Sequence, residues 1–434
     1  MEAAAPPPKE RLESLDAFRG FTILGMVFVI AIAAGGYQWE PGHLPQKMSW
    51  FGSLPVSTWF HAEVGYDLWV REQAALGATP EQIAAMPAAS LRNIGCTLTD
   101  LIAPWFVFIV GVCIPIGRQR MGAEWWRHTG FRTLMLIIAG MVYISLVIRQ
   151  ITWWWGVLQA IGVAYFCGAV FSRLPRVWRW PAVLGVGGVN LLLTEVWPPW
   201  TTALKDIAAP FGTLTNPNGN WFKPWIVHCL PWLSISYGVM TMIGVQVGEA
   251  VATKQPSAIL RRCVVVGGIY ALLGYAIHRI GFATGNWSLC MNKPDVTTSY
   301  AFFAGGTGAL VFLAFYWIID VYKYRRWAWP LGVFGMNPLL AYFMMILMRR
   351  AFETLGIAAT GADWNKVGFF NPVTGANTTV YHWARLLGGG EPAPWVLDFF
   401  RKSGYHGVMW GLMWTALLWL IVLWFNRRRI YWKF

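Results

Sequence analysis

The chain has 434 residues, of which 56% are hydrophobic and only 12% are charged. A soluble domain carries about 25% charged residues, so this composition excludes an ordinary soluble protein and indicates a polytopic membrane protein. The net charge of +14 would suggest a nucleic-acid partner in a soluble protein. Here the basic residues lie mainly in short segments between apolar runs, so no nucleic-acid partner is expected.

Ten stretches contain approximately the 20 mostly apolar residues that a membrane-spanning helix needs. They are residues 18–36, 98–117, 133–149, 156–174, 182–199, 231–252, 263–281, 299–321, 329–348 and 406–426. The predicted fold class is therefore all-α: an integral membrane bundle of about ten transmembrane helices, forming a single domain over residues 13–434. Residues 1–12 lack the basic-then-apolar order of a signal peptide, and we expect a disordered cytoplasmic tail there.

The distribution of basic residues predicts the orientation of the bundle. More than half of the 34 Lys and Arg lie in short segments between the apolar runs or at the chain ends. The positive-inside rule places these segments and both termini in the cytoplasm. The long loops 37–97, 200–230, 282–298 and 349–405 are then external, where they either form a substrate vestibule or only cover the bundle.

The six cysteines form no CxxC pair, which gives no sign of metal or redox chemistry. A disulfide among Cys96, Cys229 and Cys290 stays open, because sequence cannot choose a pair. HExxH, Walker and GxSxG motifs are also absent from the sequence, so no metal site is expected.

Asp100 stands at the head of an apolar run, in CTLTDLIAPWFVFIVG. A carboxylate at this position is costly unless it is paired, hydrated or used. His61 is the loop histidine closest to it in sequence, and a histidine with a carboxylate partner is the usual arrangement for proton transfer near neutral pH. We take Asp100 and His61 as candidate catalytic residues, although a single loop histidine is more often structural or exposed.

Asp16 and Arg19 are three residues apart at the start of the first run and can pair on one helical face. This pair is either an ordinary interfacial helix start or a polar cytoplasmic mouth for an anionic ligand. Gln159 lies within the fourth run and Asn337 precedes a proline within the ninth, so both are candidate ligand-binding amides or helix–helix contacts.

Asn292 and Lys293 precede the eighth run. The lysine is placed to neutralise a phosphate or a carboxylate. As with the buried amides, the alternative is a purely structural contact between helices.

Six sequence blocks occur in a characteristic order: RLESLDAFRGFTILGMVFV, CTLTDLIAPWFVFIVGVCIP, WGVLQAIGVAYF, MNKPDVTTSYAFFAGG, FGMNPLLAYF and RRRIYWKF. Together they resemble the heparan-α-glucosaminide N-acetyltransferase-like membrane proteins, including their bacterial relatives. The resemblance implies a helical-bundle acyltransferase that takes an acetyl group from cytoplasmic acetyl-CoA, its co-substrate, to an amine on the far side of the membrane, typically on a glucosamine. It also implies a catalytic histidine in the first external loop and places family residues at Asp100, Asn292, Lys293 and Asn337.

The chain departs from the family pattern at three places. Ile30 stands where the first span usually ends in Asn, Ser90–Asn93 contains no histidine, and Phe222–Trp225 replaces an acidic block. The inserted segment 62–90 also separates His61 from Asp100. These changes lie on the side expected to be external, where the acceptor would bind, so we expect the acceptor to differ or the activity to be lost.

The leading hypothesis is a transmembrane acyltransferase that acetylates an amino-sugar or another glycan acceptor in the bacterial inner membrane. Acetyl-CoA would bind near Asp16 and Arg19, His61 would act as base or acetyl carrier, and Asp100 would orient it. A transporter for a sugar or a lipid-linked intermediate and a non-catalytic scaffold are the alternatives. The expected partners are the bilayer, acetyl-CoA and the glycan, and a homodimer stays open.

Overall fold

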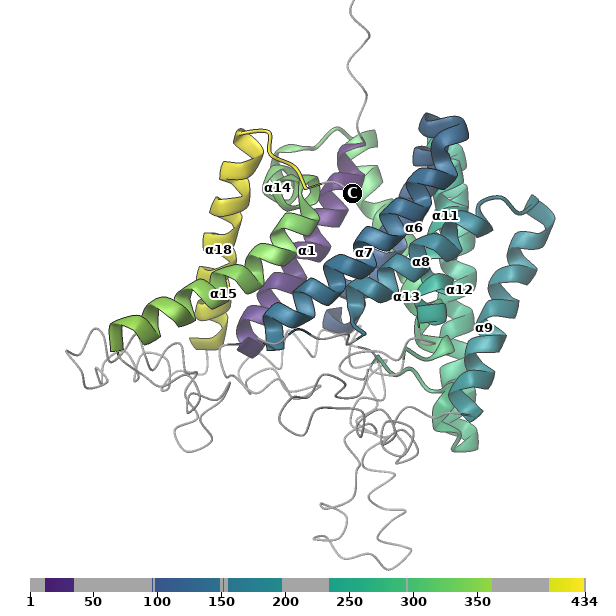
Figure 1. Ribbon diagram of the computed structural model, residues 1–434. Coiled ribbons are helices and arrows are strands. Elements are labelled where there is room, and N and C mark those ends of the chain that lie inside the picture. The colour runs from purple at the N-terminus through teal and green to yellow at the C-terminus, as the bar shows by residue number, and fades with distance from the viewer. Residues whose placement is uncertain are drawn as a thin grey trace, which may run out of the picture.

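A computed structural model describes residues 12–34, 96, 98–148, 151, 155–196, 234–293, 296–360 and 406–432. This part of the chain is all helical and contains no β-strand. The long helices (Figure 1) are α1 Glu13–Ala34, α6 Leu98–Met121, α7 Trp125–Ile148, α8 Val157–Phe171, α9 Arg179–Val196, α11 Ser234–Ala252, α12 Pro256–Thr284, α13 Thr298–Tyr316, α14 Trp329–Met336, α15 Pro338–Thr360 and α18 His406–Arg427. Each of the ten predicted runs is thus occupied by helix, and the ninth is divided between α14 and α15.

Six of the described helices are long and apolar enough to cross a membrane. These spans are Glu13–Ala31, Asp100–Gln119, Trp125–Leu146, Ser234–Ala252, Pro256–Gly281 and Thr298–Val321. The number is seven if Arg326–Met336 and Pro338–Ala351, which are bent by 73°, are counted as one broken span. Helix α8, at about 22 Å, is shorter than the bilayer core of about 30 Å. The predicted integral membrane character is confirmed, whereas the number of ten spans is not.

The most enclosed helix is α11, whose apolar window is 83% buried. It packs tightly along α6, where a Cβ added at Gly244 would collide with the carbonyl oxygen of Phe108, and one added at Gly111 with that of Thr241. Small residues allow such close helix–helix approach in membranes, where van der Waals packing replaces the hydrophobic effect as the force between helices. The α6–α11 pair is therefore the centre of the bundle.

Exposed apolar side chains follow the outer faces of the peripheral helices. On α7, Phe131, Leu134, Ile138 and Val142 are 54%, 53%, 42% and 47% exposed. Their spacing of three to four residues places them along one side of the helix. A stripe of this kind is a liability in water but matches the acyl chains of a bilayer, which supports an integral membrane protein.

One end of the bundle gathers the basic residues, and we call it the basic end. Arg118, at the close of α6, donates a hydrogen bond to the carbonyl of Ser172, just after α8. Arg325 pairs with Glu13 at the start of α1, with 2.8 Å between Nη1 and Oε1. Helices α1 and α6 are antiparallel, because Arg19 near the start of α1 contacts Cys113 near the close of α6. The opposite end, where α6 begins, is called the Asp100 end.

Several sequence predictions lie outside the described residues. His61, the insertion 62–90, the departures at 90–93 and 222–225, and most of the loops 37–97, 200–230 and 349–405 belong to this group. Ile30 is described, and it packs half-buried against the core from α1.

Candidate functional site

At the Asp100 end, two residues 193 positions apart form an ion pair. Nζ of Lys293 lies 3.1 Å from Oδ1 of Asp100, and the two side chains are 40% and 21% exposed. Asp100 occupies the first turn of α6, where the helix dipole favours a negative charge. The hydroxyl of Tyr300 on α13 donates to the backbone carbonyl of Asp100 at 2.6 Å. The carboxylate predicted to need a partner thus has one, and α13 fixes the backbone that carries it.

The segment between α12 and α13 positions the lysine. The N–H of Asn292, a buried residue, donates to Oγ1 of Thr297 at 3.0 Å, and Oγ1 of Thr297 donates to the carbonyl of Cys290 at 2.8 Å. The N–H of Met291 donates to Nδ1 of His278 at 3.0 Å. Because Nδ1 accepts this bond, the neutral imidazole carries its proton on Nε2. These local bonds hold the turn that presents Lys293 to Asp100.

Two buried thiols border the same region. The pKa of Cys96 is well above its usual value because burial disfavours the thiolate and because the charge of Asp100 adds to that effect, while Lys293 opposes it. Burial raises the pKa of Cys290 to about 12. No disulfide joins these two cysteines to each other. Cys229, the third candidate for a disulfide, lies outside the described residues.

At the basic end, the predicted pairing of Asp16 with Arg19 is confirmed. Nη1 of Arg19 lies 3.2 Å from Oδ1 of Asp16 and also donates to the carbonyl of Gly335 at 3.2 Å. Its Nη2 contacts Sγ of Cys113 at 3.0 Å. One guanidinium therefore joins α1, α6 and α14. The sequence carried no sign of the contacts to Cys113 and Gly335, because they depend on how three helices cross.

Asn337 lies at the break between α14 and α15 and is fully buried. Its Nδ2 donates to the carbonyl of Ile430 at 2.8 Å, and its Oδ1 accepts the N–H of Trp432 at 3.0 Å. The nearby amide of Asn426 donates to the carbonyl of Val333 at 2.7 Å. Asn337 therefore attaches the basic-aromatic segment after α18 to the helix break, and Asn426 attaches the end of α18 to α14.

Gln159 caps its own helix. Its Oε1 accepts the N–H of Gly156 at 3.1 Å at the start of α8. The carboxamide fills the space that a side chain at Gly140 on α7 would need. The fully buried Gln159 thus lies at the α7–α8 contact.

The predicted site residues separate into two groups. Asp100, Asn292 and Lys293 gather at one end of α6, whereas Asp16 and Arg19 lie near the other end, beside Cys113. The 13 residues from Asp100 to Cys113 correspond to about 20 Å along the helix axis. The structure places polar groups near both ends of one apolar helix, and it does not bring all candidates into one cluster.

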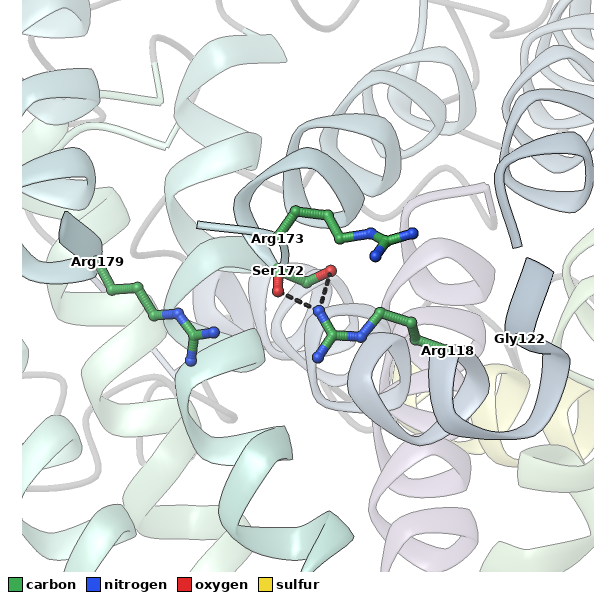
Figure 2. Close-up of a pocket in the computed structure, with 5 residues that line it drawn as sticks. All are labelled: Arg118, Gly122, Ser172, Arg173 and Arg179. Carbon is green, nitrogen blue, oxygen red and sulfur yellow. Dashed lines mark hydrogen bonds between the residues drawn. The ribbon is translucent and has the colours of Figure 1, made fainter. Parts of the chain in front are cut away.

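A cavity of ≈ 560 Å³ opens at the basic end between the ends of α6, α8 and α9. Figure 2 shows the residues that line it, Arg118, Gly122, Ser172, Arg173 and Arg179. A second cavity of ≈ 350 Å³ lies nearby and is lined by Arg176, Glu249, Ala250, Thr253, Ala258, Arg261, Arg262 and Val265. From the sequence, these arginines predicted only the orientation of the bundle. Their convergence on cavities could not be predicted, because it depends on how the helix ends meet in the folded protein. Within the described residues, no group of three or more His, Cys, Asp or Glu is placed to hold a metal ion.

Comparison with known proteins supports the family resemblance of the sequence blocks. The sequence profile described as "Heparan-alpha-glucosaminide N-acetyltransferase, catalytic" matches residues 78–280, which include α6 to α11 and most of α12. A mouse protein named heparan-alpha-glucosaminide N-acetyltransferase is 26% identical over 323 residues, covering 57% of this chain. The aligned region spans 47% of the length of that relative.

Proposed function

We infer from these matches that the chain is a member of the heparan-alpha-glucosaminide N-acetyltransferase family, and we propose that it is a transmembrane acyltransferase. In this proposal an acetyl group passes from acetyl-CoA, bound from the cytoplasm, to an amino-sugar or another glycan acceptor on the opposite side. The single domain of residues 13–434 lies in a bacterial inner membrane with both termini cytoplasmic. The observation that carries the proposal is the profile match over residues 78–280.

The geometry of the bundle is compatible with transfer across a membrane. Polar groups occupy both ends of α6, and the helix between them is packed into the apolar core with α11. Under the positive-inside rule the basic end faces the cytoplasm, so the Asp100 end faces the acceptor side. The donor would then meet Asp16 and Arg19, and the acceptor would meet Asp100 and Lys293.

The chemistry requires a base close to the acceptor. The acceptor nitrogen or oxygen attacks the thioester carbonyl of acetyl-CoA, the base removes the proton of that nucleophile, and the C–S bond breaks to release coenzyme A as the thiol. We propose that His61 is this base or carries the acetyl group transiently. Asp100 would orient the histidine and stabilise its positive form, with Lys293 holding the carboxylate in place.

The remaining candidates have supporting roles in this proposal. Asn292 would shape the turn that carries Lys293, and Gln159 would stabilise the α7–α8 contact. We further propose that Asn337 hydrogen-bonds the acetyl carbonyl when the C-terminal segment moves away from the helix break. In the structure, its amide is engaged by Ile430 and Trp432.

Proteoliposomes provide the direct test. Acetyl-CoA is placed outside the vesicles and radiolabelled glucosamine inside, or the reverse, and the protein is expected to form N-acetylglucosamine. The His61→Ala variant is expected to lower the rate of acetylation by a factor of about 10² to 10⁴, the range typical of the loss of a general base. His406→Ala serves as a matched histidine control. Full activity in His61→Ala would remove the assignment of the base but not the family, whereas absence of acetyl-CoA binding to the intact protein would overturn the proposed function.

A transporter is the second candidate because of one observation, the broken helix pair. The 73° bend at Asn337 resembles the discontinuous helices that form substrate sites in secondary transporters. In the same proteoliposomes, a transporter moves the sugar without consuming acetyl-CoA. Flux of unmodified sugar at a rate independent of acetyl-CoA would favour this candidate.

A further inference from the structure

The arginine-lined cavity at the basic end is not used by the proposed reaction. We propose that it is a binding site for a phosphate-bearing anion, with Arg118 and Arg173 as the phosphate ligands. The chemistry is that of an anionic phospholipid headgroup at the cytoplasmic interface or of a soluble phosphate compound. This inference does not rest on acetyl transfer, since a lipid site would exist in a transporter or a scaffold as well.

The protein engages the guanidinium groups of Arg118 and Arg173 only in part. Arg118 donates through Nη1 to the carbonyl and hydroxyl of Ser172, which orders its side chain. Its other nitrogens make no hydrogen bond within the part of the chain that the structure describes. The guanidinium of Arg173 makes a cation–π contact to Trp126 at 5.7 Å and no hydrogen bond to any described residue. Both groups therefore keep donors for a ligand, and guanidinium forks match the oxygen geometry of phosphate.

The charge of the cavity also favours an anion. In Figure 2 the guanidinium of Arg118 lies between those of Arg173 and Arg179. Arg179 is neutralised by Glu249 and donates through Nε to the carbonyl of Leu174. Among the described residues that line the cavity none is acidic, so Arg118 and Arg173 give this lining a positive charge. Like charges held near one cavity repel each other, and an anion between them would remove that cost.

The cavity lies at the level expected for the surface of the bilayer. It opens at helix ends that are flanked by exposed Trp126 and Trp178, at 43% and 61% exposure. Tryptophan marks the headgroup level of a membrane. Basic pockets between transmembrane helices at the cytoplasmic side bind anionic headgroups, and ≈ 560 Å³ is within the usual size range of ligand pockets of about 300–1,000 Å³. These features favour a lipid over a soluble source.

The test compares the protein in nanodiscs of phosphatidylcholine alone with nanodiscs of equal parts phosphatidylcholine and phosphatidylglycerol. Native mass spectrometry counts retained phosphatidylglycerol, and thermal unfolding reports stabilisation. We expect Arg118→Ala/Arg173→Ala to retain about tenfold less phosphatidylglycerol than the intact protein. The matched control is Arg326→Ala/Arg427→Ala, which removes the same charge from exposed positions at the same end and outside the cavity.

Inorganic pyrophosphate added to phosphatidylcholine nanodiscs forms the second arm. If pyrophosphate stabilises the intact protein and the control but not the cavity variant, the site is assigned to a soluble phosphate compound instead of a lipid. Arg173→Glu provides a second variant, since Arg173 is exposed and its replacement leaves the Arg118–Ser172 bonds in place. If the cavity variants respond to both probes as the control does, the proposal is overturned.

Discussion

The ion pair with Lys293 offsets the free-energy cost of placing the Asp100 carboxylate at the head of an apolar helix. An isolated carboxylate at the edge of an apolar span is unfavourable, and the lysine supplies the opposite charge at 3.1 Å. The hydrogen bond from Tyr300 fixes the backbone of the same residue. The start of α6 therefore presents a paired and positioned aspartate.

A double-mutant cycle with Asp100→Asn and Lys293→Met measures the coupling free energy between the two side chains of this ion pair. Because both side chains are partly exposed, we expect a coupling free energy of about 1 kcal/mol in thermal or denaturant unfolding, above the value for a fully exposed pair. The control cycle uses Glu13→Gln and Arg325→Met, whose partners are 46% and 44% exposed. A coupling at Asp100–Lys293 no larger than that of the control would show that the contact does not hold the site together.

Residue types alone predicted part of this site. The identity of Asp100 as a special residue follows from its position on an apolar run, and the Asp16–Arg19 pair follows from helical spacing. The sequence also indicated that Lys293 could neutralise a carboxylate, but not which one. That choice depends on α12 and α13 bringing residue 293 back to the start of α6, a contact across 193 residues.

At the scale of helices, close backbone approach determines which elements can be neighbours. Gly244 on α11 meets the backbone of Phe108 on α6, and Gly335 on α14 meets the backbone of Asp16 on α1. A methyl group at either glycine would force two helices apart. The α1–α14 contact also brings the carbonyl of Gly335 within reach of Arg19, so packing and charge placement depend on one another.

Replacement of Gly244 by alanine is expected to destabilise the bundle, because the added methyl group meets a backbone oxygen that cannot rotate away. Overpacking of this kind costs about 1–3 kcal/mol and should lower the unfolding temperature in detergent. Gly268→Ala on α12 is the matched control, since a Cβ there meets nothing within 4 Å. The control should keep or slightly raise stability through better helix propensity. Equal stability of the two variants would contradict the tight α6–α11 contact.

Helix existence was predictable over all ten apolar runs, because apolar length is a property of the local sequence. The break in the ninth run was suggested by Asn337 and Pro338, since proline removes a backbone donor. The partners of Asn337 were not predictable. They come from the C-terminal segment, almost a hundred residues later, and the structure joins the two through Ile430 and Trp432.

For the whole molecule, the gathering of arginines at one end predicts its orientation. Arg118, Arg179 and Arg325, far apart in sequence, lie at helix ends that meet one another or the start of α1. Figure 1 shows the C-terminus close to the upper end of α1. The two described chain ends thus share the basic end, which the positive-inside rule assigns to the cytoplasm.

Reporter fusions test this orientation. A fluorescent protein fused after Phe434 should fold and fluoresce because it remains in the cytoplasm, and alkaline phosphatase at the same position should be inactive. Alkaline phosphatase inserted after Gly285, in the turn following α12 at the Asp100 end, is the control and should be active. The reverse pattern at both positions would invert the proposed direction of acetyl transfer.

The sequence by itself determined the class of protein, the approximate helix positions and the family resemblance, because composition, apolar run length and short motifs are local properties of the chain. The tertiary structure decided which charges meet. It paired Asp100 with Lys293, gave Arg19 its contacts on three helices, and placed Arg118 and Arg173 around one cavity. These arrangements depend on helix crossings set by packing over the whole bundle, and no local pattern encodes them.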